Sequence, residues 1–300
     1  MTPLRKARRG MTLAELLVAL LLMGIIGMVF TKLLVAQGRF FNNQFGQRSA
    51  RAVARAPMNL LFSELRMLQD QGALAAAQAD GKRITVKVPY RFGVVCGSAG
   101  GATVAAMLPA DSALSTTYAG WAWRAVDESY TEVVASNPQG ADSLRDVTDL
   151  AGEATCTAAR IHKPVVTLTG GGTRTGRVLE LRPASAGAPV MSPVYLWQYV
   201  AYEFKASTAY PGRVGLYRIE ADGTASPKEM ELMAPFDTSA RFRFFVPNVD
   251  TSRVTVPATL SEVRGLELVL NGSAASAASS SGPAVNRLNT AVFFKNVRAF

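Results

Sequence analysis

The longest hydrophobic segment of the chain lies near its N-terminus. No charged residue occurs between Leu16 and Thr31, and the apolar character extends from Met11 to Ala36. As a helix rising about 1.5 Å per residue, these roughly 26 residues would span about 39 Å, more than a hydrocarbon core of about 30 Å. Residues 1–10 contain four bases and no acid. The positive-inside rule therefore predicts a cytoplasmic N-terminus, with the rest of the chain on the far side of the membrane.

Three interpretations of this apolar segment meet difficulties. A cleaved secretory signal has an apolar stretch of about 7–15 residues and a small-residue cleavage site. Here the stretch is longer and the one candidate site, Leu34–Ala36, is weak. A lipoprotein anchor is excluded because no Cys precedes Cys96. A plain transmembrane anchor leaves Glu15 unexplained, since an ionised carboxylate in the apolar run costs about 3 kcal/mol unless it is paired.

The helical pattern continues beyond the apolar segment. Met58, Leu61, Leu65 and Leu68 recur with a helical period and predict an amphipathic segment that covers one face of a sheet. Pro57 should kink or restart the helix. Basic residues at positions 48, 51 and 55 predict a solvated face, with a filament contact or phospholipid head groups as alternatives.

From about residue 72 the pattern changes to short alternating runs between turn residues. Because no long helical crossovers separate the later runs, we expect antiparallel sheets. The Ala/Ser tract Ser273–Ser281 is expected to be a loop. The strand candidates are Ile84–Val88, Val165–Thr169, Val178–Leu181, Val194–Phe204, Val214–Ile219, Arg241–Val246, Leu266–Leu270 and Val292–Ala299.

Composition limits the chemistry that the chain can carry. It has 32 Lys and Arg against 22 Asp and Glu, but without the four N-terminal bases the balance is 28 against 22, which gives little reason to expect nucleic-acid binding. One His and two Cys nearly exclude a zinc site of three or four His and Cys ligands, and there is no C-x-x-C-H haem signature. Apolar residues make up 49% of the chain, which favours a packed core over disorder.

No catalytic motif emerges from the spacing. Gly171 and Gly176 have the separation of a P-loop, but Arg177 follows where Lys is needed, so a tight loop between strands is expected. Gly97–Gly101 does not form a G-x-S-x-G elbow. His162 is expected at the surface, and the Trp residues are expected to pack on the sheets. We therefore predict that the protein is not an enzyme and holds no cofactor and no metal.

Cys96 and Cys156 are the only cysteines, and both lie in the part of the chain predicted to be exported. An oxidising compartment would permit a disulfide between them, and two free buried thiols are the alternative.

The string RRGMTLAEL, from Arg8 to Leu16, resembles the class III signal of the type IV prepilin family. The resemblance implies that a prepilin peptidase cuts between Gly10 and Met11 and methylates the new amine of Met11, where the family most often has Phe. Glu15 then becomes the fifth residue of the mature chain. In the family this Glu is thought to reach the N-terminal amine of a neighbouring subunit, and pairing with the amine of its own chain is the alternative.

Two looser resemblances point to one branch of this family. Leu60–Arg66 is similar to the end of the helix in PilW-like and J-type sequences, and Val292–Arg298 is similar to the terminal strand of PilW-like minor pilins. The resemblance implies an α+β fold in which a long N-terminal hydrophobic helix packs on a large antiparallel β-sheet head. The expected parts are a leader (1–10), a transmembrane helix (11–36), an extramembrane helix (37–71) and a β-rich head (72–300).

The function implied is that of a minor pilin that initiates or caps a type IV pilus. Its partners would be the prepilin peptidase, the inner membrane, the pilus assembly platform, the major pilin and other minor pilins, with no nucleic acid expected. The chain would sit in the inner membrane, with a periplasmic head, before it enters a cell-surface pilus. A J-type pseudopilin of type II secretion, a DNA-uptake pilin, and a membrane-anchored enzyme or ligand-binding domain are the alternatives.

Overall fold

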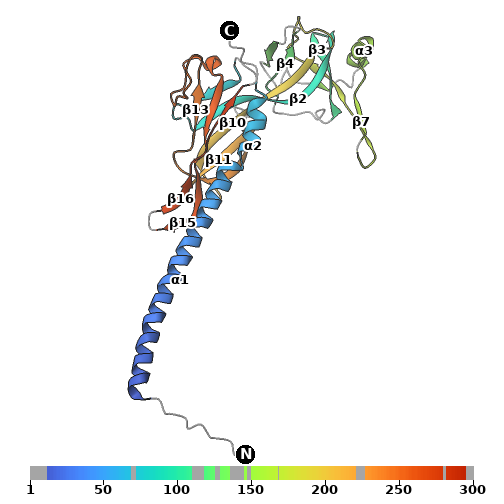
Figure 1. The fold of residues 1–300 in the computed structure, drawn as a ribbon. Helices are drawn as coiled ribbons and strands as arrows, with labels where there is room; N and C mark the ends of the chain where they lie inside the picture. The colour runs from blue at the N-terminus through green and yellow to red at the C-terminus, as the bar shows by residue number, and fades with distance from the viewer. Residues whose placement is uncertain are drawn as a thin grey trace, which may run out of the picture.

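The fold was obtained as a computed structural model (Figure 1), which describes residues 12–68, 72–109, 118–125, 129–135, 145–146, 150–167, 169–220, 227–279 and 282–294. A 43-residue helix, α1 (Leu13–Arg55), extends far beyond the rest of the molecule. The helix is interrupted at Pro57, which has no N–H to donate, and a shorter helix follows, α2 (Met58–Arg66). The predicted break at Pro57 is confirmed.

The architecture is α+β, as predicted: the long N-terminal helix packs against a large antiparallel sheet. Twelve described strands form this sheet, and its main path runs β16-β15-β12-β11-β10-β2-β3-β9-β6, with β1, β4 and β5 attached at its sides. Their bounds are β1 Leu74–Ala77, β2 Arg83–Ala99, β3 Ala102–Met107, β4 Gly120–Arg124, β5 Tyr130–Val134, β6 Arg145–Asp146, β9 Arg177–Leu181, β10 Pro193–Ala206, β11 Val214–Glu220, β12 Lys228–Phe236, β15 Gly272–Ser279 and β16 Gly282–Asn286.

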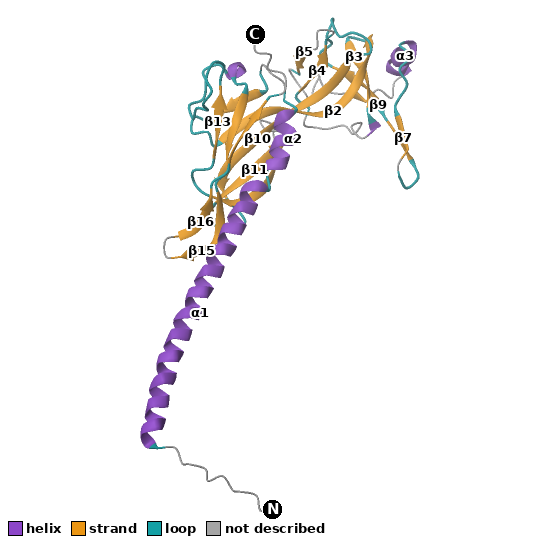
Figure 2. Ribbon diagram, in the orientation of Figure 1, coloured by secondary structure: helices purple, strands orange, loops and turns teal. Residues whose placement is uncertain are grey.

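A second, three-stranded sheet faces the first, and a two-stranded ribbon projects from the far end of the head (Figure 2). The second sheet contains β13 (Arg241–Phe245), β14 (Gly265–Val269) and β17 (Asn289–Phe293). The ribbon contains β7 (Val165–Thr167) and β8 (Thr173–Thr175), and the glycine run between them forms the expected loop. A helix, α3 (Leu150–Ala158), and a 3-10 turn, Leu260–Glu262, complete the described head.

Strand β2 is longer than the pattern predicted. The prediction ended the strand before Pro89, whereas β2 continues to Ala99. The register with β10 shifts between Leu196 and Trp197, which lie opposite Arg91 and Pro89, so the strand carries a bulge there. A bulge is one of the few places where a strand accepts proline, because a ladder hydrogen bond is already missing.

The prediction of a loop at Ser273–Ser281 is wrong for residues 273–279, and residues 280 and 281 lie outside the described part of the chain. Gly272–Ser279 forms strand β15, which pairs with β12 and β16 and packs along α1 (Figure 1). At the start of this strand, Gly272 permits a close approach to the helix. A Cβ at Gly272 would lie 2.1 Å from the carbonyl oxygen of Ala50, inside the backbone of α1.

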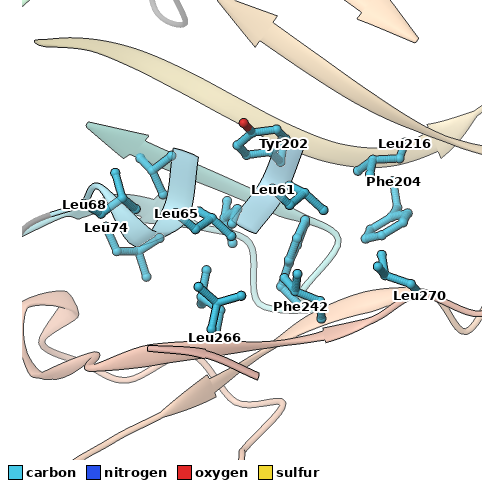
Figure 3. Packing of buried hydrophobic residues seen from close by; sticks show 14 of the residues in the cluster. Leu61, Leu65, Leu68, Leu74, Tyr202, Phe204, Leu216, Phe242, Leu266 and Leu270 are labelled. Carbon is cyan, nitrogen blue, oxygen red and sulfur yellow. The ribbon is translucent and has the colours of Figure 1, made fainter. Parts of the chain in front are cut away.

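The main core lies between the two sheets, with α2 inserted at its edge (Figure 3). Leu61, Leu65 and Leu68 are completely buried there, so the predicted amphipathic stripe does cover the sheet. They meet Tyr202 from the large sheet and Leu266 from the small one. A second, distal core around Trp121 and Leu196 lies beyond, and the long strands β2 and β10 connect the two.

Candidate processing and assembly site

The N-terminus of α1 is built around a reciprocal pair, Thr12 and Glu15. The backbone N–H of Thr12 donates to Glu15 Oε2 (3.0 Å), and the backbone N–H of Glu15 donates to Thr12 Oγ1 (3.3 Å). The Thr12 hydroxyl also donates to Glu15 Oε2 (3.2 Å). This is a capping box, in which two otherwise unpaired backbone donors are satisfied by side chains.

Sequence reasoning missed the part played by Thr12. The signal was present, because Thr followed three residues later by Glu ahead of an apolar run is the sequence signature of a capping box. The box gives Glu15 a local role: its carboxylate turns back to the first turn of α1, where the helix dipole favours negative charge. Gly10 and Met11 lie outside the described residues. Pairing of Glu15 with an N-terminal amine, in its own chain or a neighbour's, therefore stays a prediction.

Beyond this box, α1 presents an apolar surface that the rest of the chain leaves uncovered. Every Leu, Ile, Val, Met and Phe side chain from Leu13 to Val35 is at least 49% exposed. This helix is long and apolar enough to cross a membrane. An uncovered apolar surface of this extent requires lipid or other apolar helices around it.

Residues 5–31 match the prokaryotic N-terminal methylation motif. The chain carries the N-terminal motif of the type IV prepilin and pseudopilin family. The motif implies processing by a prepilin peptidase and assembly into pilus-like filaments, and the apolar helix is consistent with an inner-membrane anchor before assembly. The comparisons with curated proteins and with solved structures found no match.

The prepilin-type helix is coupled to the head by small residues. Gly46, Ala50, Val53 and Ala54 form the buried side of α1, and β15 packs against this side where Gly272 meets Ala50 and Ala54. Since no side chain separates the two backbones at Gly272, the helix and the strand can move relative to each other only if this contact opens.

A buried ionic cluster fixes α2 to the large sheet. Glu64 accepts two hydrogen bonds from Arg218, from Nε to Oε2 (3.1 Å) and from Nη2 to Oε1 (2.9 Å). The Tyr202 hydroxyl donates to the same carboxylate, and Arg218 also pairs with Glu220. The side chains of Glu64 and Arg218 are only 13% and 10% exposed. A bidentate pair with this little exposure sets one orientation of α2 on the sheet.

The pKa values of this cluster follow from its burial and its charges. Burial and the charge of Glu64 raise the pKa of Tyr202 far above its usual range, so the phenol stays a donor. Burial acts to lower the pKa of Arg218, but the hydrogen bonds and charge of Glu64 outweigh it and raise that pKa above its ordinary value. The bidentate ion pair and the Tyr202 hydrogen bond thus form a structural clamp between α2 and the large sheet.

A second carboxylate, Glu231, holds the turn between β10 and β11. It accepts hydrogen bonds from the hydroxyls of Ser207, Thr208 and Tyr217 and from the backbone N–H of Ala209. Burial acts to raise the pKa of Glu231, but these hydrogen bonds outweigh it and lower it to about 2.

The two cysteines lie in the distal part of the head. A disulfide joins Cys96 on β2 to Cys156 on α3, and both residues are buried beside Val104 and Val178. The bridge attaches α3 to the large sheet.

The remaining candidates for chemistry do not converge. His162 is exposed in the segment that follows α3, and Trp121 and Trp197 are completely buried, as expected for packing residues. Within the described ranges, no three His, Cys, Asp or Glu side chains come close enough to hold a metal ion.

Proposed function

We propose that the chain is a minor pilin of a type IV pilus, PilW-like, which initiates or caps the filament after prepilin peptidase cleaves it between Gly10 and Met11. Before assembly it sits in the inner membrane with its N-terminus in the cytoplasm and its head in the periplasm. Its partners are the assembly platform, the major pilin and other minor pilins. Its role is structural.

The observation that carries the position in the filament is the shape of the head. The head is built on two cores, and the distal one extends sideways from the axis of α1 (Figure 1). Helices in a thin filament pack about 8–10 Å apart, so a head of this width crowds its neighbours if it is repeated at every position. A tip position leaves space for it.

In this proposal, Glu15 supplies the driving force for moving the helix from the membrane into the filament. Its carboxylate is costly within a bilayer unless it has a partner, and an amine of a neighbouring N-terminus provides one in the filament. The contacts to Thr12 satisfy part of its hydrogen-bonding capacity and leave its charge without a counter-ion among the described residues.

The test compares Glu15→Ala with Thr12→Ala as a matched control. We expect both variants to insert and to be cleaved. Glu15→Ala should reduce recovery of the chain in sheared filaments at least tenfold, whereas Thr12→Ala, which removes only the cap, costs about 1 kcal/mol of helix stability and should change recovery little. Equal recovery of wild type and Glu15→Ala would overturn the proposed role of Glu15. Recovery of the chain only in a secretion pseudopilus would favour the J-type alternative, and recovery only with a DNA-uptake apparatus would favour the DNA-uptake pilin. Turnover of a substrate by the purified chain would favour the anchored enzyme.

A further inference from the structure

The outer side of α1 above the membrane carries an uncovered row of aromatic and basic side chains. Phe41 and Phe45 are 67% and 73% exposed, and Arg48, Arg51 and Arg55 are exposed as well. We call these five residues the docking stripe. With about 100° of rotation per residue, the stripe lies opposite the buried side of α1, which is formed by Gly46, Ala50, Val53 and Ala54.

The arginines of the docking stripe have no counter-charge in their own chain. No ion pair is made by Arg48, Arg51 or Arg55 within the part of the chain that the structure describes. The sequence explains why: from Leu16 to Ser63 there is no Asp or Glu at all. Three guanidinium groups therefore lie within about 10 Å of helix, at 1.5 Å per residue, and repel one another.

Phospholipid head groups are poorly placed to neutralise the stripe. Arg48 follows the apolar segment that ends at Ala36 by 12 residues, or about 18 Å of helix. This exceeds the screening length of about 8 Å at physiological salt, and Arg55 lies farther still.

A second copy of the chain is an equally poor partner. Its own helix presents the same bases at the same level, so parallel packing of two copies would bring like charges together. The head offers no acidic excess, since residues 72–300 contain 22 Lys and Arg against 19 Asp and Glu.

We infer that the docking stripe binds a different subunit of the prepilin class, one that presents carboxylates on its extramembrane helix or the adjoining face of its head. Arg and aromatic side chains are the residues enriched at the centres of protein interfaces, and here they continue the uncovered apolar surface of the same helix. The inference rests on the proposed function and deepens it. The charge pattern disfavours self-assembly along this face and makes incorporation beside an acidic partner selective.

The experiment uses the full chain in cells, with a crosslinkable lysine introduced into the docking stripe. Arg51→Lys keeps the positive charge and supplies an amine that a carbodiimide couples to a neighbouring carboxylate. The matched control is Ser49→Lys, two residues earlier and about 160° away around the helix. Crosslinking is done both in the membrane and in sheared filaments, so the stripe is tested even if the chain never enters a filament.

We expect Lys at position 51 to couple to an Asp or Glu of another prepilin-class subunit, at least tenfold more than Lys at position 49. Reversing the three arginines to Glu should abolish co-recovery of that subunit, and changing its coupled carboxylate to Lys should restore it. Coupling to a second copy, or equal coupling at both positions, would overturn the inference. The inference would also be overturned if the chain bound DNA through the three arginines and gave no crosslink to any protein. Failure of the proposed function is distinct: the chain would be absent from filaments whatever the crosslinking result.

Discussion

The buried pair of Glu64 and Arg218 provides the sharpest test of how the helix is held to the head. Replacing Glu64 with Ala leaves the guanidinium of Arg218 without its bidentate partner at a site where the Arg218 side chain is only 10% exposed. Removing one member of a buried ion pair costs about 3–5 kcal/mol. Arg218 retains Glu220, whose side chain is 36% exposed, so we expect the lower end of this range, about 3 kcal/mol.

At roughly 2–4 °C per kcal/mol for a head of this size, the predicted loss corresponds to a fall in Tm of about 6–12 °C. Thermal unfolding of the full chain in detergent, followed by near-UV circular dichroism, measures it. Glu64→Gln keeps the shape and one acceptor oxygen and should lie between wild type and Glu64→Ala. Asn59→Ala is the matched control, because Asn59 is exposed on the same helix and should shift stability by no more than about 0.5 kcal/mol. Indistinguishable melting of Glu64→Ala and Asn59→Ala would refute the clamp.

Three further changes test other parts of the fold. Gly272→Ala should destabilise the protein by about 3 kcal/mol and expose the junction of α1 and β15 to protease, because its Cβ would meet the backbone of Ala50; an undamaged junction would contradict the close contact. Replacing Cys96 and Cys156 together with Ser should lower the free energy of unfolding by about 2–4 kcal/mol, measured by tryptophan fluorescence in denaturant, since the bridge closes a loop of 60 residues. Glu231→Gln should lower the free energy of unfolding by about 1 kcal/mol at pH 7. Because the pKa of Glu231 is lowered from 4.5 to about 2, the wild-type advantage should be complete above pH 4.5 and fade toward pH 2, so melting curves at pH 7 and pH 3 that show the same difference would contradict it.

The elements that could be predicted from the sequence are those whose pattern is set by one dominant contact. Leu61 and Leu65 recur with the helical period because one side of α2 faces a core, and the alternation at the start of β13 records one buried face. The break at Pro57 follows from covalent chemistry alone.

The elements that could not be predicted depend on contacts distant in sequence. Strand β15 has no apolar alternation, and the close approach at its Gly272 is to the backbone of α1, some 220 positions earlier. The continuation of β2 past Pro89 depends on the bulge opposite β10. Helix α3 is short, and it is held to the sheet by the disulfide at Cys156 and by packing against β2, β3 and β9.

The same division holds for the candidate site. Glu15 could be identified from a resemblance, and its partner Thr12 was readable as a capping signature. The ion pair between Glu64 and Arg218 could not be predicted, because no pattern in the sequence around either residue shows that Arg218 lies against α2.

Mass spectrometry of the N-terminal peptide, from native membranes and from sheared filaments, tests the central claim most directly. The account predicts that the leader is absent from both samples, that the chain begins at Met11 with a methylated amine, and that this mature form is present in the filaments. An intact leader, or a chain that begins near Gln37 after loss of the apolar helix, would contradict it.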